Sequence, residues 1–161
     1  MAKLELAAAI VVHKRRVLVV RRSKQEAFLP RHWGIPCGKI DVDDGESSRE
    51  AVLRELREET GLIGEIVESV GTSYFMSSWQ GEPTENIQEN FLVRLDASAR
   101  LRPGLTLKPR VKTPRRDQRA KWIPIRRIRG FGLDDHNLGA ILQGVNPSQP
   151  DTAELAAQFG K

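Results

Sequence analysis

The amino-acid sequence predicts a single layered α/β domain, with helices packed against β-strands. Its 161 residues suit one hydrophobic core. The apolar fraction of 39% and the charged fraction of 29% are typical of a soluble globular protein. Along the chain, β-rich runs lie on both sides of one central helical pattern and precede a second helical pattern. This order is expected of a layered α/β fold.

The first quarter of the chain predicts a hairpin followed by turns. Residues 4–12 and 16–21 are β-rich runs, and the segment His13-Lys14-Arg15 separates them. Residues 23–31 are polar and predict a loop. The glycines and proline of residues 32–38 predict a turn that enters a short strand near residues 39–40. A tight acidic loop is expected at residues 41–45.

Residues 46–62 predict the central helix, which begins near Ser47 and ends at Gly61. A serine at the start can accept a hydrogen bond from an amide that has no partner within the helix. Gly61 is a natural left-handed stop. The helix has an apolar stripe and an outward polar side, formed by Val52, Leu53 and Leu56 and by Glu50 and Arg57, respectively.

The second half of the chain predicts further strands. Residues 62–76 and 87–95 predict two strands on either side of a polar loop at residues 77–85. Residues 101–114 contain prolines and many basic residues, so they predict irregular chain or an edge strand. Residues 121–125 predict another short strand.

Two helices are expected near the end of the sequence. Residues 134–143 predict a helix capped by Asp134 or Asp135. Residues 151–159, which lie beyond two prolines, predict a short terminal helix. We therefore expect a domain over residues 1–145 and a C-terminal tail over residues 146–161.

Three carboxylates of the central helix, Glu55, Glu58 and Glu59, share one face, because side chains three and four residues apart lie together on a helix. Each such like-charged pair costs a few tenths of a kcal/mol in an isolated helix. A divalent cation would turn this repulsion into attraction, and a site with oxygen ligands alone favours Mg²⁺ or Mn²⁺ over zinc. Arg54 is placed to hold Glu58 in position. The alternative from the helix alone is an ordinary exposed helix with salt bridges.

Charge and cysteine content limit the classes of partner. The net charge is +5, and the segment from Lys108 to Arg129 carries ten Lys or Arg against one acid, Asp117. Such a patch attracts phosphates of a nucleotide or a polynucleotide, although a solvated surface is an equal alternative. The single cysteine, Cys37, excludes an internal disulfide and a cysteine-based zinc site. No apolar run approaches the roughly 18 residues of a membrane helix, and the N-terminus lacks a signal-peptide layout. A cytoplasmic protein is expected.

The central helix and its flanks resemble the signature of the Nudix family. That signature is Gly, five residues, Glu, seven residues, then Arg-Glu-apolar-x-Glu-Glu-x-Gly-apolar. The segment from Glu46 to Leu62 fits it without a gap. The segment 33–39 and the later Trp122-Ile123-Pro124 are also similar to family patterns, so the resemblance covers residues 5–143.

Two departures from the family pattern stand out. Gly38 and Glu46 enclose seven residues instead of five, so that a strict count from Gly38 would put Asp44 in the first acidic position. The downstream register favours Glu46. Cys37 stands where a second glycine is common, and we expect it to be an inert structural thiol. The longer loop also suggests that Asp43 and Asp44 add contacts to a metal or to its ligands.

The resemblance implies a Nudix-type α/β/α sandwich with a mixed β-sheet. It implies a Mg²⁺-dependent hydrolase, with Mn²⁺ as an alternative ion, that splits the diphosphate linkage of a nucleoside diphosphate derivative. The implied metal ligands are Glu55, Glu58, Glu59 and the Gly38 carbonyl, and Glu59, Glu58 and Arg54 are the implied catalytic residues. Glu59 is one candidate for the base, and Glu85, Glu89 or Asp117 outside the motif are others.

Candidates for substrate binding follow from residue chemistry. Bases bind by stacking and edge hydrogen bonds, which draws attention to the aromatic residues Trp33, Tyr74, Trp79, Phe75 and Phe28. A core role is the alternative for Trp33, Phe75 and Phe28, whereas Trp79 in the polar loop is expected to face solvent. Lys39, together with Arg21 or Arg22, could meet phosphate charge.

Several functions agree with the resemblance. The leading prediction is a MutT-like pyrophosphohydrolase of a (deoxy)nucleoside triphosphate, and an ADP-ribose or nucleotide-sugar pyrophosphatase is an alternative. A non-catalytic module that binds a nucleotide or RNA is a different class, and an RNA-end pyrophosphohydrolase would use the basic segment. We expect a nucleotide-type small molecule as the substrate and no membrane association. The resemblance also allows a homodimer.

Overall fold

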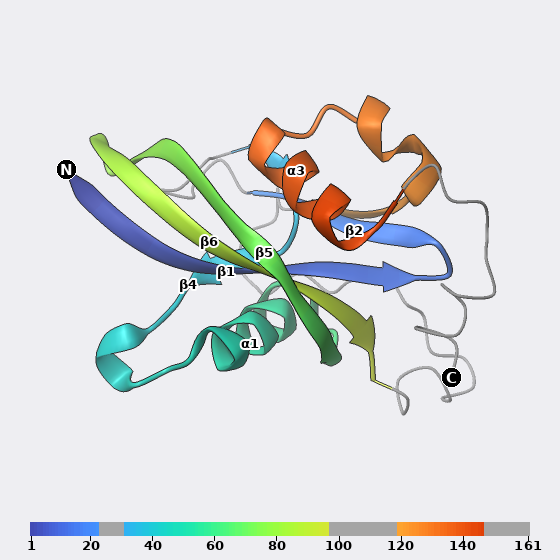
Figure 1. Ribbon diagram of the computed structural model, residues 1–161, viewed down its shortest axis with the longest axis horizontal. Helices are drawn as coiled ribbons and strands as arrows, with labels where there is room; N and C mark the ends of the chain where they lie inside the picture. The colour runs from blue at the N-terminus through green and yellow to red at the C-terminus, as the bar shows by residue number, and fades with distance from the viewer. Residues whose placement is uncertain (23–30, 97–118, 147–161) are drawn as a thin grey trace.

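The computed structural model describes residues 1–22, 31–96 and 119–146. These residues form a seven-stranded sheet with a helix on each side (Figure 1). The strands are β1 (Ala2–His13), β2 (Arg16–Arg21), β3 (Trp33–Gly34), β4 (Cys37–Lys39), β5 (Gly64–Trp79), β6 (Glu82–Leu95) and β7 (Arg119–Pro124). The helices are α1 (Ser48–Thr60) and α3 (Asp135–Gly144), with the short 3₁₀ turns η1 (Val42–Asp44) and η2 (Ile125–Gly130).

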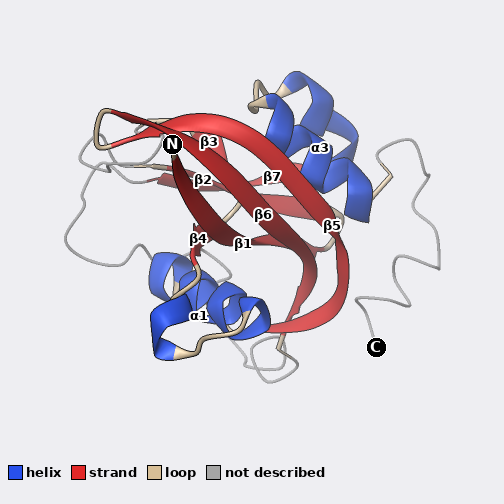
Figure 2. Ribbon diagram, turned by 60° about the vertical axis from the view of Figure 1, so that its left-hand side comes forward, coloured by secondary structure: helices blue, strands red, loops and turns tan. Residues whose placement is uncertain are grey.

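The sheet is mixed, as the resemblance to the Nudix family implies. Its main order is β3-β2-β1-β6-β5, with β4 paired to β1 and β7 paired to β2. β1 runs parallel to β6 and antiparallel to β2 and β4. The helices α1 and α3 lie on opposite faces of this curled sheet (Figure 2), so the α/β layered fold is confirmed.

Alternation along β1 divides the core into two layers. Leu6, Ala8 and Ile10 belong to the layer that contains Ala140 and Ile141 of α3. Their neighbours Ala7, Ala9 and Val11 belong to the layer that contains Val52 and Leu56 of α1. Since side chains of a strand point alternately to the two faces, one strand supports both helices.

The hairpin between β1 and β2 is confirmed. His13 pairs with Arg16, and the two turn residues, Lys14 and Arg15, have φ values of 48° and 64°. Two successive left-handed residues match the twist of the flanking strands. The strand predicted at residues 121–125 and the helix predicted at 134–143 are confirmed by β7 and α3. The predicted side-chain cap is wrong, because Asp134 precedes α3 but makes no capping hydrogen bond and its carboxylate contacts His32 instead.

The predicted polar loop at residues 77–85 is wrong. β5 continues to Trp79 and β6 begins at Glu82, so that only Gln80 and Gly81 form the turn, with φ values of 51° and 82°. The polar side chains form cross-strand contacts instead, as in the 2.7 Å hydrogen bond that Asn86 Nδ2 donates to Ser77 Oγ.

Other predictions concern residues that the structure does not describe. They are most of the loop at residues 23–31, the basic segment at 101–114 and the terminal helix at 151–159. In the parts of the chain that are described, no helix has the length and apolar character needed to cross a membrane.

Candidate active site

Helix α1 is fixed at both ends by its terminal residues. Ser47 Oγ accepts a hydrogen bond from the Glu50 N–H at 3.1 Å, and Glu50 Oε1 accepts one from the Ser47 N–H at 3.3 Å, which together form a capping box. At the other end Gly61 has a φ of 76° and donates its N–H to Arg57 O at 2.8 Å. The predicted start and end of the helix are confirmed, and the carboxylates between them project from a fixed backbone.

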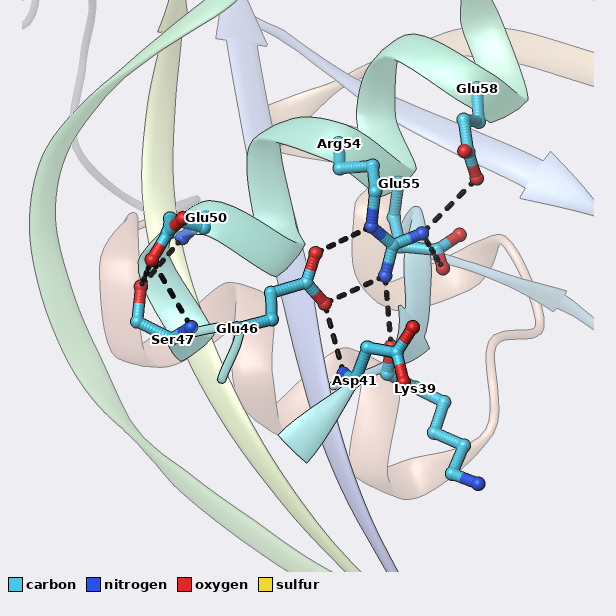
Figure 3. Close-up of polar contacts among 8 residues, drawn as sticks. All are labelled: Lys39, Asp41, Glu46, Ser47, Glu50, Arg54, Glu55 and Glu58. Carbon is cyan, nitrogen blue, oxygen red and sulfur yellow. Dashed lines mark hydrogen bonds and ion pairs between the residues drawn. The ribbon is translucent and has the colours of Figure 1, made fainter. Parts of the chain in front are cut away.

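Arg54 lies at the centre of a cluster of carboxylates (Figure 3). Its Nε and Nη2 donate to the two oxygens of Glu46 at 2.6 and 2.9 Å, which is a bidentate ion pair. Its Nη1 donates to Glu55 Oε1 at 2.9 Å and to Glu58 Oε2 at 3.2 Å. The hydrogen bonds from Arg54 lower the pKa of Glu46 from 4.5 to about 2. One guanidinium therefore orients three carboxylates.

The loop before the helix places Glu46 against Arg54. Glu46 Oε1 accepts a hydrogen bond from the Asp41 N–H at 2.9 Å, and Asp41 O accepts one from the Glu46 N–H at 3.1 Å. The loop closes on itself in this way, and its extra residues are accommodated in η1, where Asp43 and Asp44 are exposed. The charge of Asp44 raises the pKa of Asp41. The contact with Arg54 agrees with the register that favours Glu46.

Gly38 and Glu55 are in close contact. A Cβ atom at position 38 would collide with the side chain of Glu55, so any larger residue here would displace that carboxyl group. The Glu55 side chain is largely buried, and burial raises its pKa although Arg54 acts in the opposite direction. The Gly38 backbone and the Glu55 carboxylate therefore form one continuous polar surface.

Cys37, next to Gly38 on β4, is buried in the core layer that contains α3. Burial raises the pKa of its thiol to about 12, and the charges of Glu59 and Glu55 add to this effect. Its Sγ lies 3.3 Å from Gln88 Oε1. As predicted, Cys37 is a buried structural thiol, which at this pKa stays protonated.

The donor chemistry of this cluster fits a hard divalent cation. Glu55, Glu58 and Glu59 offer only oxygen atoms, and the charge of Glu58 raises the pKa of Glu55, as expected of carboxylates that repel one another. In the described part of the chain, no three carboxylate, imidazole or thiol groups converge in a ready-made metal site. Arg54 Nη1 lies between Glu55 and Glu58 instead and supplies the positive charge.

A small pocket, partly open to solvent, lies on the other side of β4. Its walls come from the end of β2, the segment 32–37, β6 and the first turn of α3. Its lining residues are Val20, Arg22, His32, Trp33, Gly34, Ile35, Cys37, Gln88, His136 and Asn137. Arg22 Nη2 donates to Cys37 O at 2.9 Å, which holds this cation at the strand that separates the pocket from the carboxylates.

The wall formed by α3 is tied to the opposite wall by side chains. His32 Nδ1 lies 2.6 Å from Asp134 Oδ2, and Asn137 Oδ1 accepts a hydrogen bond from the Ile35 N–H at 3.2 Å. A Cβ at position 34 would lie 2.8 Å from the Asn137 amide, so Gly34 allows this close approach. The pocket is therefore held by contacts between segments about a hundred residues apart.

Comparison with known proteins identifies the family. Residues 3–140 match the family described as NUDIX domain. The chain belongs to the NUDIX family. Solved structures agree with this fold. The MutT NUDIX hydrolase from Burkholderia pseudomallei has a TM-score of 0.66 at 22% identity, and the match covers 90% of this chain and 100% of that one.

Two curated relatives illustrate the range of sequence similarity. The 8-oxo-dGTP diphosphatase of Escherichia coli (strain K12) is 29% identical over 96 residues, which cover 52% of this chain and 73% of that protein. The RNA pyrophosphohydrolase of Cereibacter sphaeroides (strain ATCC 17029) is 44% identical over 61 residues, which cover 38% of this chain and 36% of that protein. In other relatives the match spans only 20% to 51% of their length.

The predicted residues of the Nudix motif come together as a group. Arg54, Glu55 and Glu58 are in direct contact, and Gly38 lies against Glu55. Of the other candidates for the base, Glu89 pairs in register with Ala7, which also pairs with Gly38, so Glu89 projects to the face that carries α1. Glu85 is exposed further along β6, and Asp117 lies outside the described residues.

The predicted substrate residues are not brought together. Trp33 lines the pocket and packs edge-on against Phe131, with Lys121 Nζ 5.3 Å from its ring centroid. The prediction that Trp79 faces solvent in a loop is wrong. Trp79 is the last residue of β5 and packs on the core. Tyr74 is 72% exposed on β5, and the exposed Lys39 accepts a hydrogen bond from Arg54 through its carbonyl. Phe28 lies outside the described residues.

Sequence reasoning missed four polar residues of the pocket: His32, Gln88, His136 and Asn137. A signal for two of them exists, because His136 and Asn137 are polar residues in the first turn of a helix whose later residues are mostly apolar. Gln88 belongs to a row of buried polar residues on β6, Thr84, Asn86, Gln88 and Asn90.

Proposed function

We propose that this protein is a Mg²⁺-dependent hydrolase of a diphosphate linkage in a nucleoside diphosphate derivative, and that this derivative is a (deoxy)nucleoside triphosphate. The observation that carries this proposal is the arrangement around β4. Gly38 meets the carboxylates of α1, and its neighbour Cys37 lines the pocket. A nucleotide with its base in the pocket could therefore extend its phosphates toward the carboxylates.

Glu55, Glu58 and Glu59, with the Gly38 carbonyl, would hold Mg²⁺, with Mn²⁺ as an alternative. The bound ion would neutralise phosphate oxygens and lower the pKa of an attacking water. Arg54 keeps Glu46, Glu55 and Glu58 in position from outside this ligand set. A cation on Glu55 and Glu58 would take over the role of Arg54 Nη1 as their counter-charge.

The reaction that we propose is attack of water on one phosphorus atom of the diphosphate. The new P–O bond forms as the bridging P–O bond breaks, which yields a nucleoside phosphate and a second phosphate product. Glu59 is the proposed base that accepts the proton of the attacking water. Arg22, held at Cys37 O, is placed to meet phosphate charge from the side of the pocket.

The names of the relatives support this class of substrate. They include an 8-oxo-dGTP diphosphatase and a CTP pyrophosphohydrolase of Escherichia coli, both named for nucleoside triphosphates. An RNA-end substrate is a second candidate, since other relatives are named RNA pyrophosphohydrolase and the η2 turn exposes Arg126, Arg127 and Arg129. ADP-ribose, a nucleotide sugar and simple nucleotide binding remain alternatives to be tested in the same panel.

The test is neutral substitution of the carboxylates. Glu58→Gln and Glu59→Gln each remove one negative charge without changing side-chain shape, so we expect turnover to fall by at least about 10²-fold with the fold retained. Phosphate products are measured for deoxynucleoside triphosphates, ADP-ribose, a nucleotide sugar and 5′-triphosphate RNA over a Mg²⁺ series.

The matched control is Glu50→Gln on the same helix. Glu50 is exposed, and glutamine can replace glutamate in a capping box, so this variant keeps wild-type turnover. Wild-type rates in Glu58→Gln or Glu59→Gln would contradict the catalytic assignment. A wild-type protein that hydrolyses no member of the panel would favour the binding module.

A further inference from the structure

The amide of Asn137 has only one orientation that satisfies its neighbours. Asn137 is 5% exposed and lines the pocket. The backbone N–H of Ile35, 3.2 Å away, can only donate a hydrogen bond, so the amide atom that faces it must be the oxygen. The amide nitrogen, Nδ2, therefore faces the other way, toward His136.

This orientation fixes the protonation of His136. His136 Nε2 lies 3.1 Å from Asn137 Nδ2, and an amide nitrogen can only donate. Nε2 must therefore accept, which requires a neutral imidazole with its proton on Nδ1. The tautomer of His136 therefore follows from two successive hydrogen bonds, one from the Ile35 N–H to the Asn137 amide and one from that amide to the His136 ring.

The imidazole ring itself is held by stacking. Its centroid lies 3.7 Å from that of Phe75, and the two planes differ by only 11°. Phe75 belongs to β5 and packs on the core cluster that contains Ile141 of α3. The ring of His136 thus rests on a side chain of the sheet, and its acceptor atom has a defined position relative to Asn137.

We propose that His136 is a positioning residue, whose neutral ring fixes the Asn137 amide so that this amide presents a constant donor and acceptor to the edge of a planar nucleobase in the pocket. The inference rests on the proposed function, since it concerns the recognition of that substrate. An amide that could turn over would exchange donor and acceptor, and the pocket would lose discrimination among bases.

Protonation of His136 would break this arrangement. A proton on Nε2 would face the N–H groups of Asn137 Nδ2, so two donors would meet. The amide would have to turn or move, and the hydrogen bond from Ile35 would be lost. Nucleobase binding should therefore weaken in acid.

The groups that face His136 keep it neutral near pH 7. Burial is the largest effect and lowers its pKa, and His32 and Arg22 from the opposite wall act in the same direction. Asp134 and Asp135 on α3 itself raise the pKa but do not reverse the shift. β5 contributes the uncharged ring of Phe75. The neutral ring is thus the state in which the pocket operates at neutral pH.

The experiment combines nuclear magnetic resonance with binding, in the absence of Mg²⁺ so that no hydrolysis is needed. The ¹⁵N shifts of the His136 ring and of the Asn137 side-chain amide are followed from about pH 7.5 to about pH 5. The affinities of dGMP, dAMP, dCMP and TMP are measured over the same range for the wild type, His136→Gln and His136→Leu. His13→Gln, which changes a histidine outside the pocket, is the matched control.

The expected result has three parts. The His136 ring carries its proton on Nδ1 at neutral pH, and the Asn137 amide shifts with the same midpoint as the ring. Wild-type affinity for the preferred monophosphate falls about fivefold in acid, the equivalent of one hydrogen bond, and the His13→Gln variant behaves alike. His136→Gln supplies a non-titrating acceptor and keeps only the pH dependence that comes from the phosphate group of the ligand itself. His136→Leu discriminates poorly among the four bases at every pH.

Other results would overturn the proposal. One such result is a proton on Nε2 of His136 at neutral pH. Another is an Asn137 amide whose shift does not change as His136 titrates, and a third is a His136→Gln variant with the pH dependence of the wild type. If none of the monophosphates binds, the proposed nucleotide pocket fails, but the response of the Asn137 amide still decides whether His136 positions it.

Discussion

Two residues of the candidate site, Gly38 and Arg54, determine where the neighbouring carboxylates lie. Gly38 shows this most directly, because the carboxyl group of Glu55 occupies the volume that a Cβ atom would need. Arg54 shows it through charge, since its guanidinium contacts Glu46, Glu55 and Glu58 at once. Neither residue needs to touch a substrate in order to control where the carboxylates lie.

Gly38→Ala should therefore reduce activity far more than stability. The added methyl group forces the Glu55 carboxylate to move, and a displacement of about 1 Å at a catalytic group can cost about 10²-fold in turnover. Overpacking should cost about 1–3 kcal/mol in the free energy of unfolding. Both quantities are measured on the same preparation, by phosphate release and by urea denaturation.

Gly139→Ala is the control for this change. No atom lies within 4 Å of a Cβ at position 139, in the middle of α3, so alanine should be neutral or stabilise the helix by about 0.5–1 kcal/mol. Equal turnover in Gly38→Ala and the wild type would show that Glu55 does not need its place against Gly38.

At this scale the sequence revealed the carboxylates but not the pocket. Glu55, Glu58 and Glu59 are neighbours on one helix, so local periodicity is enough to place them on one face. His32 and Asp134, like Ile35 and Asn137, are 102 residues apart in the chain. Only the packing of α3 on the sheet brings these pairs together, and no local pattern encodes it.

Among the elements, α1 contributes most to the site because it carries the carboxylates, and its two capped ends fix the backbone that holds them. Ser47 and Glu50 cap one end, and Gly61 in a left-handed conformation closes the other. The turn between β5 and β6 contrasts with it. There, polar residues such as Ser77 and Asn86 lie in strands and bond to each other, so composition alone suggested a loop. Buried polar pairs hide the apolar alternation that normally identifies a strand.

Ser47→Ala tests the capping of α1. Loss of the hydroxyl leaves the Glu50 N–H without its acceptor, and we expect the free energy of unfolding to fall by about 1 kcal/mol. Ser48→Ala, one residue later and already within the helix, is the matched control and should change stability by less than about 0.5 kcal/mol. Both variants are compared by urea denaturation, and equal losses would mean that the capping box does not stabilise the helix.

At the scale of the whole molecule, β1 and β6 join the two core layers. Even-numbered residues of β1 pack toward α3 and odd-numbered residues toward α1. β6 likewise contributes Leu92 to the first layer and Phe91 and Val93 to the second. Since both layers rest on the same two paired strands, neither should persist when the other unfolds.

Substitutions in the two layers should accordingly destabilise one cooperative unit. Leu56 of α1 and Ile141 of α3 are both fully buried, and truncation of either to alanine should cost about 2–5 kcal/mol. Unfolding is followed in urea by tryptophan fluorescence, which reports on Trp33 and Trp79 in the α3 layer and Trp122 in the α1 layer, and by far-ultraviolet circular dichroism. We expect the two signals to coincide in the wild type and in both variants, with an unchanged dependence on urea. Separate transitions in Ile141→Ala, with the circular dichroism of α1 retained after the fluorescence change, would instead show that the α1 layer folds without α3.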